Sequence, residues 1–145
     1  MSHLRKQVKQ FVEQELTKAR FEVSSGESES RGVDFIVKTP SGKYHELFLQ
    51  PINLDFARSV KIPKSDLGEL KENLWIALVF VMKEIEPVLH LIPSKILENP
   101  DNYIFFDHEQ DERFRHLSNW EIKVFQKSIG ELSKYSLTNM VSKLG

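Results

Sequence analysis

The chain has 145 residues, of which 40% are hydrophobic and 28% charged, so its length and composition suit one domain with a substantial core. Its formal net charge is −1, which excludes a global positive field that would attract nucleic acid. Affinity for a polyanion would have to come from a local basic patch. The absence of cysteine excludes disulfides, thiolate nucleophiles and thiolate metal sites.

The first twenty residues carry too many charges for a secretory signal peptide, and no apolar run reaches the length of a membrane span. We therefore expect a cytoplasmic protein that has no membrane partner.

Helical spacing of apolar residues predicts an amphipathic helix from Ser2, as N-cap, to Ala19. A short strand, Phe21–Val23, is expected next. The segment Ser24–Gly32 is polar and shows no periodicity, so it is predicted to be a loop.

A hairpin is predicted at the centre of the sequence, with strands Val33–Val37 and Tyr44–Ile52 joined by the turn Thr39–Lys43. Alternation places Asp34 on one face of the first strand. In the second strand, one face carries Glu46, Phe48 and Gln50. A carboxylate beginning one strand, with acid and amide side chains along its partner, predicts either a metal site or a polar strand end.

The remaining elements follow from periodicity and from turn residues. The segment 52–66 is interpreted as a connection lying over the sheet, followed by a helix that Ser65 caps and that runs to Lys71. The further expected elements are strands Leu74–Met82 and Val88–Ile92, a short helix Ser94–Leu97, a strand Tyr103–Phe106, a charged loop His108–Ser118, an edge strand Trp120–Phe125, and a helical region Ile129–Leu144 that breaks near Tyr135.

This order predicts an α/β (α+β) fold: a single domain, 1–145, with a mixed central sheet flanked by helices. The core is expected at about 4–94, with a C-terminal elaboration at about 95–145. His90 lies in an apolar strand and is interpreted as a core histidine. His108 and His116 lack a recognised ligand spacing and are expected at the surface.

The central hairpin and the segment Leu70–Val79 (LKENLWIALV) make the chain resemble the PD-(D/E)XK nuclease-like superfamily, which has a restriction-endonuclease-like fold. It is especially similar to bacterial domains of unknown role that carry an L-x-x-N-x-W-x-A-L-V strand. The resemblance covers roughly Leu4–Ser94 and, more loosely, Trp120 and Leu132–Tyr135. It implies a nuclease-like core with a degenerate active site.

The chemistry that the resemblance implies is metal-dependent phosphodiester cleavage. An Asp on one strand and a Glu-x-Lys motif on the next would hold Mg²⁺ and position a water molecule. Asp34 matches the first position. Phe48 stands where the Glu is expected and cannot ligate a hard cation, and Gln50 stands at the Lys position.

Two sets of residues leave alternatives open. Glu46 shares a face with Phe48 and would lie roughly 6–7 Å away along the strand, so a bulge could bring it towards Asp34 as a second metal ligand. Glu13 or Glu15 on the first helix could add another. Basic side chains of the connecting segment could contact phosphates or simply be solvated: Arg58, Lys61 and Lys64.

Three hypotheses follow. The preferred one is a PD-(D/E)XK-like domain that has lost, or nearly lost, metal-dependent cleavage and binds a nucleic acid or a protein partner. The second is a divergent Mg²⁺-dependent nuclease that uses Asp34, Glu46 and Gln50. The third is a homodimeric scaffold whose apolar surface would come from Trp120, Phe125 and Met140–Leu144, if these are not covered within the chain.

Overall fold

The computed structural model describes residues 2–25 and 33–145, and within them eight strands form two sheets. The first sheet contains β1 (Glu22–Ser25), β2 (Phe35–Lys38), β3 (Tyr44–Asn53), β5 (Leu74–Met82) and β6 (Ile85–Pro93), in the order β1-β2-β3-β5-β6. The second contains β4 (Ser59–Pro63), β8 (Asn119–Lys123) and β7 (Phe105–His108), in the order β4-β8-β7. The prediction of a mixed α/β fold is confirmed.

The first sheet is mixed because β3 and β5 are parallel while its other neighbouring strands are antiparallel. A parallel pair needs a crossover connection. Here the crossover consists of β4 and the single-turn helix α2 (Lys64–Leu67), so the connection also contributes a strand to the second sheet.

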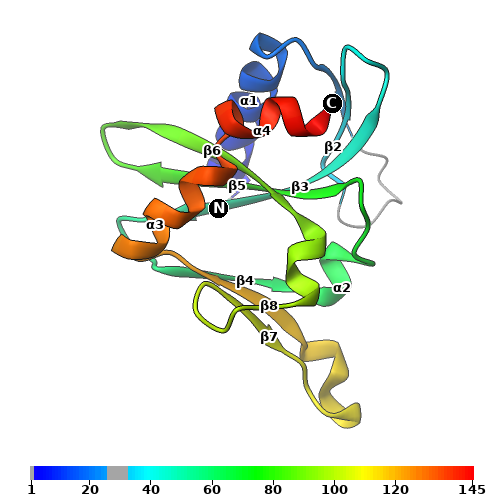
Figure 1. Cartoon of the computed structure of the whole chain (residues 1–145). Helices are drawn as coiled ribbons and strands as arrows, with labels where there is room; N and C mark the ends of the chain where they lie inside the picture. Colours follow the sequence, from blue (N-terminus) through cyan, green and yellow to red (C-terminus); the bar gives the residue numbers. More distant parts are fainter. Residues whose placement is uncertain (1, 26–32) are drawn as a thin grey trace.

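Helices α1 (Ser2–Lys18) and α4 (Leu137–Leu144) lie on one side of the first sheet, and the second sheet lies on the other side (Figure 1). Helix α1 buries Val8, Val12 and Leu16 in the core. The sequence predicts helices on both faces of the central sheet. The second face is instead packed mainly against another sheet.

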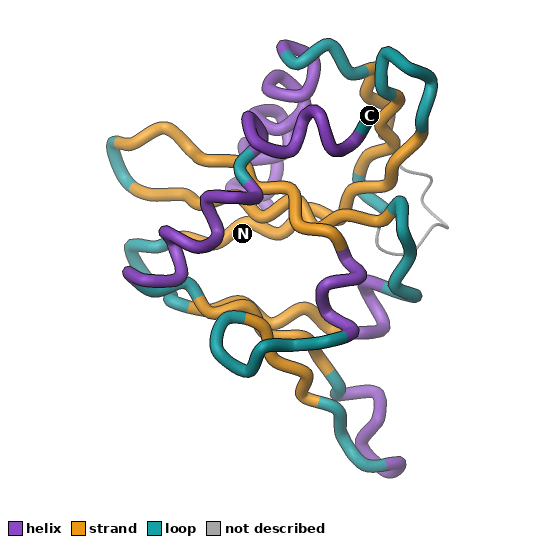
Figure 2. Tube along the Cα trace, in the orientation of Figure 1, coloured by secondary structure: helices purple, strands orange, loops and turns teal. Residues whose placement is uncertain are grey.

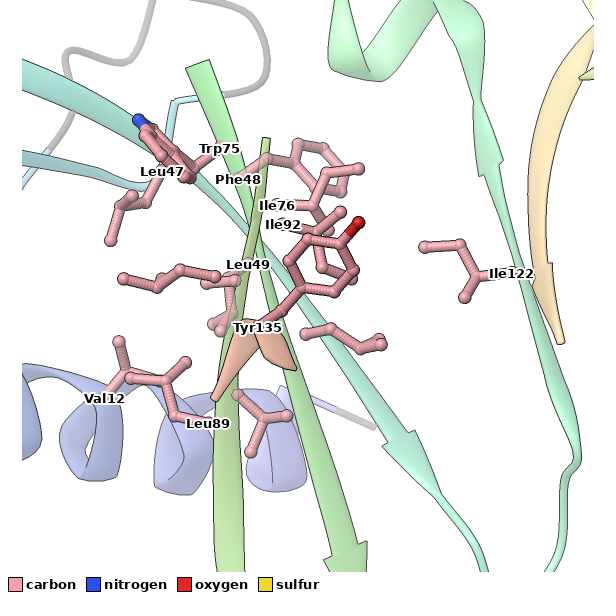
Figure 3. Close-up of a cluster of buried hydrophobic side chains, with 14 of the residues drawn as sticks. Val12, Leu47, Phe48, Leu49, Trp75, Ile76, Leu89, Ile92, Ile122 and Tyr135 are labelled. Carbon is pink, nitrogen blue, oxygen red and sulfur yellow. The ribbon is translucent and has the colours of Figure 1, made fainter. Parts of the chain in front are cut away.

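The core between the two sheets is built from alternate residues of the buried strands. Phe48 of β3 is paired with Ile76 of β5, which is paired with Ile92 of β6, and all three are buried. Figure 3 shows these side chains on the side of the sheet that faces Ile122 of β8, and Val12 of α1 on the other side. Burial on both faces explains why β5 is an uninterrupted apolar run.

The C-terminal region runs from α3 (Gln126–Leu132) through the 3₁₀ turn η3 (Ser133–Tyr135) to α4. The predicted break near Tyr135 is confirmed, and an isolated bridge between His90 and Ser136 holds this break against the edge of β6. Two further 3₁₀ helices complete the described elements: η1 (Ser94–Glu98) and η2 (Glu112–Leu117).

Three local predictions are wrong. The segment predicted as a connection contains β4, and the helix expected to run to Lys71 ends at Leu67, with Pro63 rather than Ser65 at its N-cap position. Gly68 has a φ of 79°, a conformation that glycine adopts readily and that ends α2. The strand Trp120–Phe125 was expected at an edge, but β8 is the middle strand of the second sheet.

Two expectations concern particular segments of the chain. Most of the predicted loop Ser24–Gly32 lies outside the described residues, and its first two residues belong to β1. In the described part of the chain, every helix is too short or too polar to cross a membrane.

Candidate functional site

Asp34 lies immediately before β2, at the point where β2 stops pairing with β3. Its backbone N–H donates to Leu47 O at 2.8 Å. Its side chain then takes the place of the next backbone acceptor, because Asp34 Oδ2 accepts a hydrogen bond from the Leu49 N–H at 2.7 Å. Arg5 of α1 donates to Leu49 O at 3.3 Å and to Asp34 Oδ1 at 2.9 Å. Both carboxylate oxygens of Asp34 are therefore engaged by the protein.

Glu46 and Gln50 make separate contacts. Glu46 is paired with Ile36 across the hairpin and accepts a hydrogen bond from Lys71 Nζ at 3.0 Å. Gln50 Nε2 donates to Pro51 O at 2.9 Å. Among the described residues, no hydrogen bond or ion pair joins these two side chains to Asp34 or to each other.

The donor set does not fit a divalent cation in this arrangement. Phe48, between Glu46 and Gln50 on β3, is 8% exposed and part of the core. Glu15, one of the two helix acids considered as a further ligand, pairs with Lys18 at 3.2 Å. In residues 2–25 and 33–145, no three His, Asp or Glu side chains form a cluster that could hold a metal.

The three basic residues of the connecting segment have different surroundings. The Arg58 guanidinium donates to the backbone oxygens of Leu54 and Ala57. Lys64 Nζ lies 2.6 Å from Asp107 Oδ1 and 2.6 Å from Glu109 Oε1. Lys61 is exposed on β4.

Burial alone would lower the pKa of Lys64, but its hydrogen bonds and ion pairs with Asp107 and Glu109 outweigh burial and raise that pKa. The charge of Lys64 is thus already compensated by two carboxylates of the protein. Its Nζ also lies 4.1 Å from the centre of the Trp120 ring. Of the three predicted phosphate contacts, Lys61 is the one whose side chain has no hydrogen bond or ion pair with the residues that the structure describes.

Lys61 belongs to the outer face of the second sheet. Alternation along the strands turns Ile62, Trp120 and Ile122 inward, where all three are buried. The opposite face carries a group that we call the outer platform, which consists of Lys61 on β4, Glu121 and Lys123 on β8, and Phe106 and His108 on β7. In the described residues, no helix crosses this face (Figures 1 and 2).

The register places three members of the outer platform, Lys61, Glu121 and Phe106, in one cross-strand row. Glu121 lies opposite Lys61 on one side and opposite Phe106 on the other. Lys123 Nζ lies 4.5 Å from the centre of the Phe106 ring, a cation–π contact. The rings of Phe106 and His108 are nearly parallel, with an interplanar angle of 5° and 6.1 Å between their centres. The result is a stacked pair of half-buried rings beside two lysines.

Glu121 is the acidic centre of the outer platform and is hydrogen-bonded by its neighbours. His108 Nε2 lies 2.7 Å from Glu121 Oε1. Burial alone would raise the pKa of Glu121, but hydrogen bonds from His108 and Ser59 outweigh burial and lower that pKa. The carboxylate is therefore held in place by the platform, which leaves Lys61 and Lys123 as its outward charges.

Sequence reasoning could not assemble the outer platform because it did not identify β4. Without that strand, Lys61 has no defined neighbour, and Phe106 and His108 fall in different predicted segments. The available signal was the alternation Phe106-x-His108, which places the two rings on one face of any strand that contains both.

The apolar surface considered for a homodimer is largely covered within the chain. Trp120, Met140 and Leu144 are 8%, 4% and 0% exposed, respectively. Phe125 is partly buried and contacts the Tyr103 ring edge to face, with 5.1 Å between the ring centres. These residues therefore do not provide the exposed apolar surface that the homodimer hypothesis requires.

Comparison of the sequence with protein-family models found no match, and a search of curated proteins found none either.

Proposed function

We propose that the chain is a nuclease-like domain that does not cleave phosphodiesters and that binds single-stranded nucleic acid through the outer platform. The observation that carries the proposal is one face of the second sheet that presents two lysines and two aromatic rings: Lys61, Lys123, Phe106 and His108. Base–aromatic stacking contributes about 1–3 kcal/mol per base and tolerates any base, since every base has a π-face.

The nuclease-like part of the proposal is supported by the chain order of the first sheet. A helix, a strand and a hairpin precede β5, as in the resemblance drawn from the sequence. The crossover departs from that expectation, because it contains a strand and a single-turn helix. Loss of cleavage is supported by the contacts of Asp34 and Glu46 and by the burial of Phe48, because in the described part of the chain these two carboxylates are engaged by separate partners.

Single strands fit the outer platform better than a duplex. The major groove of DNA admits a helix or a two-stranded ribbon, and a three-stranded sheet is wider than either, whereas unstacked bases can lie against half-buried rings such as Phe106 and His108. With Lys61 and Lys123 as the phosphate contacts, the affinity should be modest and sensitive to salt. The expected slope of log K against log salt concentration is about −1.4 for two contacts with a single strand.

The test is fluorescence anisotropy with labelled 12-mers of oligo(U) and oligo(dT) at several salt concentrations. Phe106→Ala should weaken binding by at least fivefold, and Phe106→Leu should do the same while retaining an apolar side chain. Lys61→Ala combined with Lys123→Ala should flatten the salt slope towards zero. Matched controls are Phe56→Ala, which removes a ring that is 87% exposed elsewhere on the surface, and Lys127→Ala on α3.

Two results would overturn this proposal. Binding that is absent at low salt, or that weakens equally in Phe56→Ala and Phe106→Ala, would remove the outer platform as the site. Cleavage of the oligonucleotides in Mn²⁺, lost in Asp34→Ala, would show an active nuclease that uses the carboxylates described above.

A further inference from the structure

A cavity of about 220 Å³ opens between η1, the turn that precedes β7, and the α3–η3 segment. Its walls include the apolar side chains of Ile104 and Leu132, which are 3% and 0% exposed. Its polar lining comes from Asp101, Glu131, Lys134 and Tyr135. This cavity is separate from the outer platform, and ligand binding at one site does not depend on the other.

Tyr135 contributes a phenol to the lining of the cavity. The residue is 8% exposed, and the described residues give its hydroxyl no hydrogen bond. Figure 3 shows the ring extending away from α1, with the oxygen directed towards the side on which Ile122 lies. Burial and the nearby charge of Asp101 raise the pKa of Tyr135, so the phenol stays protonated. Among the described residues, the Tyr135 oxygen is not one of the fully buried polar atoms without a partner, so it stays accessible and can accept a hydrogen bond from a ligand.

Asp101 is held in a fixed orientation at the mouth of the cavity. Its Oδ1 accepts the backbone N–H groups of Tyr103, Ile104 and Phe105, each at 2.9 Å. Burial alone would raise the pKa of Asp101, but these hydrogen bonds outweigh burial and lower that pKa. The carboxylate is thus a permanent negative charge whose position the turn determines.

The charges around the cavity favour a cation. Glu131 is exposed and makes no ion pair among the described residues. Lys134 lies with its Nζ 5.3 Å from the centre of the Tyr135 ring, so one face of that ring already contacts an ammonium group. Two carboxylates and one ammonium leave the lining with a net formal charge of −1.

We propose that this cavity binds a primary ammonium group carried on a short apolar stem. The ammonium would donate to the Tyr135 hydroxyl oxygen and to the carboxylates of Asp101 and Glu131, while the stem contacts Ile104 and Leu132. A free alkylamine and a lysine side chain of a peptide share this chemistry, and the cavity has room for either stem.

The test is a titration of the ¹⁵N-labelled chain with n-butylammonium chloride, followed by two-dimensional NMR, with n-butanol and NaCl as matched controls. We expect saturable shifts confined to amides of residues 99–105 and 131–135. Glu131→Gln and Tyr135→Phe should each weaken binding at least fivefold, whereas Glu86→Gln, which removes an exposed carboxylate on β6, should not. A capped Ala-Lys-Ala peptide forms a second arm.

Either arm can support the proposal: tighter binding of the peptide identifies a lysine side chain as the ligand, and tighter binding of butylammonium identifies a free amine. Equal shifts with n-butanol and butylammonium would overturn it, as would unchanged affinity in both Glu131→Gln and Tyr135→Phe. Nucleic-acid binding is measured separately, so failure of one proposal leaves the other standing.

Discussion

Asp34 and Arg5 complete the hydrogen bonding of β3 where β2 leaves it. An unpaired strand edge exposes N–H and C=O groups, and those of Leu49 are both satisfied by side chains. The ion pair itself is partly exposed and contributes little, so most of the effect should come from the bond between the carboxylate and the Leu49 N–H.

We expect Asp34→Ala to lower the free energy of unfolding by about 1–3 kcal/mol, because the Leu49 N–H loses its acceptor. Asp34→Asn keeps an acceptor oxygen and should cost less. Urea unfolding of both variants, together with Arg5→Ala and the double variant, measures the coupling between the two side chains. An Asp34→Ala protein as stable as the parent would contradict this assignment.

Mn²⁺ provides an independent check on Asp34. Because both of its oxygens are engaged, millimolar Mn²⁺ should not raise the melting temperature. A rise that Asp34→Ala abolishes would show that the ion displaces Arg5, and would favour the nuclease hypothesis.

His90 makes stability depend on pH. Burial lowers its pKa below the usual 6.5, despite hydrogen bonds with the backbone of Leu78 and Val88 that act in the opposite direction. The unfolded chain therefore takes up a proton that the folded chain resists. The stability contributed by neutral His90 is present above about pH 6.5 and is lost as the pH falls towards the lower folded pKa.

We expect the free energy of unfolding to fall by at most about 1.4 kcal/mol per pH unit through this group below pH 6.5. His90→Gln should remove that slope, whereas replacement of the exposed His116 by Gln should retain it. Urea unfolding at intervals between pH 7.5 and 5 measures the difference. Identical slopes in the parent and His90→Gln would refute the role of His90.

At the scale of elements, helix α4 depends on a buried relay of two hydrogen bonds. Trp75 Nε1 donates to His45 Nδ1 at 2.9 Å, and an indole N–H can only donate. His45 Nε2 must then carry the hydrogen, and it donates to Leu144 O at 2.7 Å. The relay satisfies a carbonyl in the last turn of a helix that has eight residues and is too short to be stable alone.

Trp75→Phe should therefore loosen α4. Phenylalanine lacks the indole N–H, so His45 loses its donor, and we expect that loss to cost about 1–3 kcal/mol beyond the smaller ring, which the control variant shares. Amide exchange of Met140 to Leu144 should become faster than in the matched variant Trp120→Phe, which leaves the relay intact. Equal exchange rates in the two variants would show that α4 is held by packing alone.

The elements that the sequence predicted well are those with a strong local signal. The bounds of β5 agree with the predicted Leu74–Met82, and α1 agrees to within a residue at its end. In contrast, β4 has only Val60 and Ile62 as apolar residues among five, which does not distinguish a strand from a connection. For β8, alternation reveals which face is buried, but not how many neighbours the strand has.

The surroundings of the candidate residues could not be read from the sequence for a similar reason. Asp34 was identified from its place in the hairpin, but Arg5 lies 29 residues earlier, on a helix whose rotation no pattern specifies. Lys64 was considered as a phosphate contact, yet it is contacted by Asp107 of β7 and by Glu109 just after that strand, in the other half of the chain. Such partners depend on tertiary packing.

At the scale of the whole molecule, the two sheets share one core. Phe48 and Ile92 of the first sheet lie on the side of Ile122 of the second (Figure 3), and all three are buried. We therefore expect the sheets to unfold together rather than as independent units.

The two tryptophans make this expectation measurable, because Trp75 lies in the first sheet and Trp120 in the second. In Trp120→Phe, fluorescence reports the first sheet; in Trp75→Phe, it reports the second. Within each variant, the urea midpoint by fluorescence should equal the midpoint by far-ultraviolet circular dichroism. Ile122→Ala should lower stability by about 2–5 kcal/mol and shift both signals. A variant in which the two midpoints separate would show that the sheets are separate cooperative units.

The route by which β4 enters the second sheet has a consequence during protein synthesis. Pro63 pairs with Asn119, so a ribosome must add about 60 more residues, for roughly 3–12 s at ~5–20 residues per second, before the partner strand emerges. Throughout that interval the nascent β4 presents Ile62 and an unpaired strand edge to solvent or to a chaperone. The last strand to be translated, β8, thus ends the period of greatest risk of misassembly.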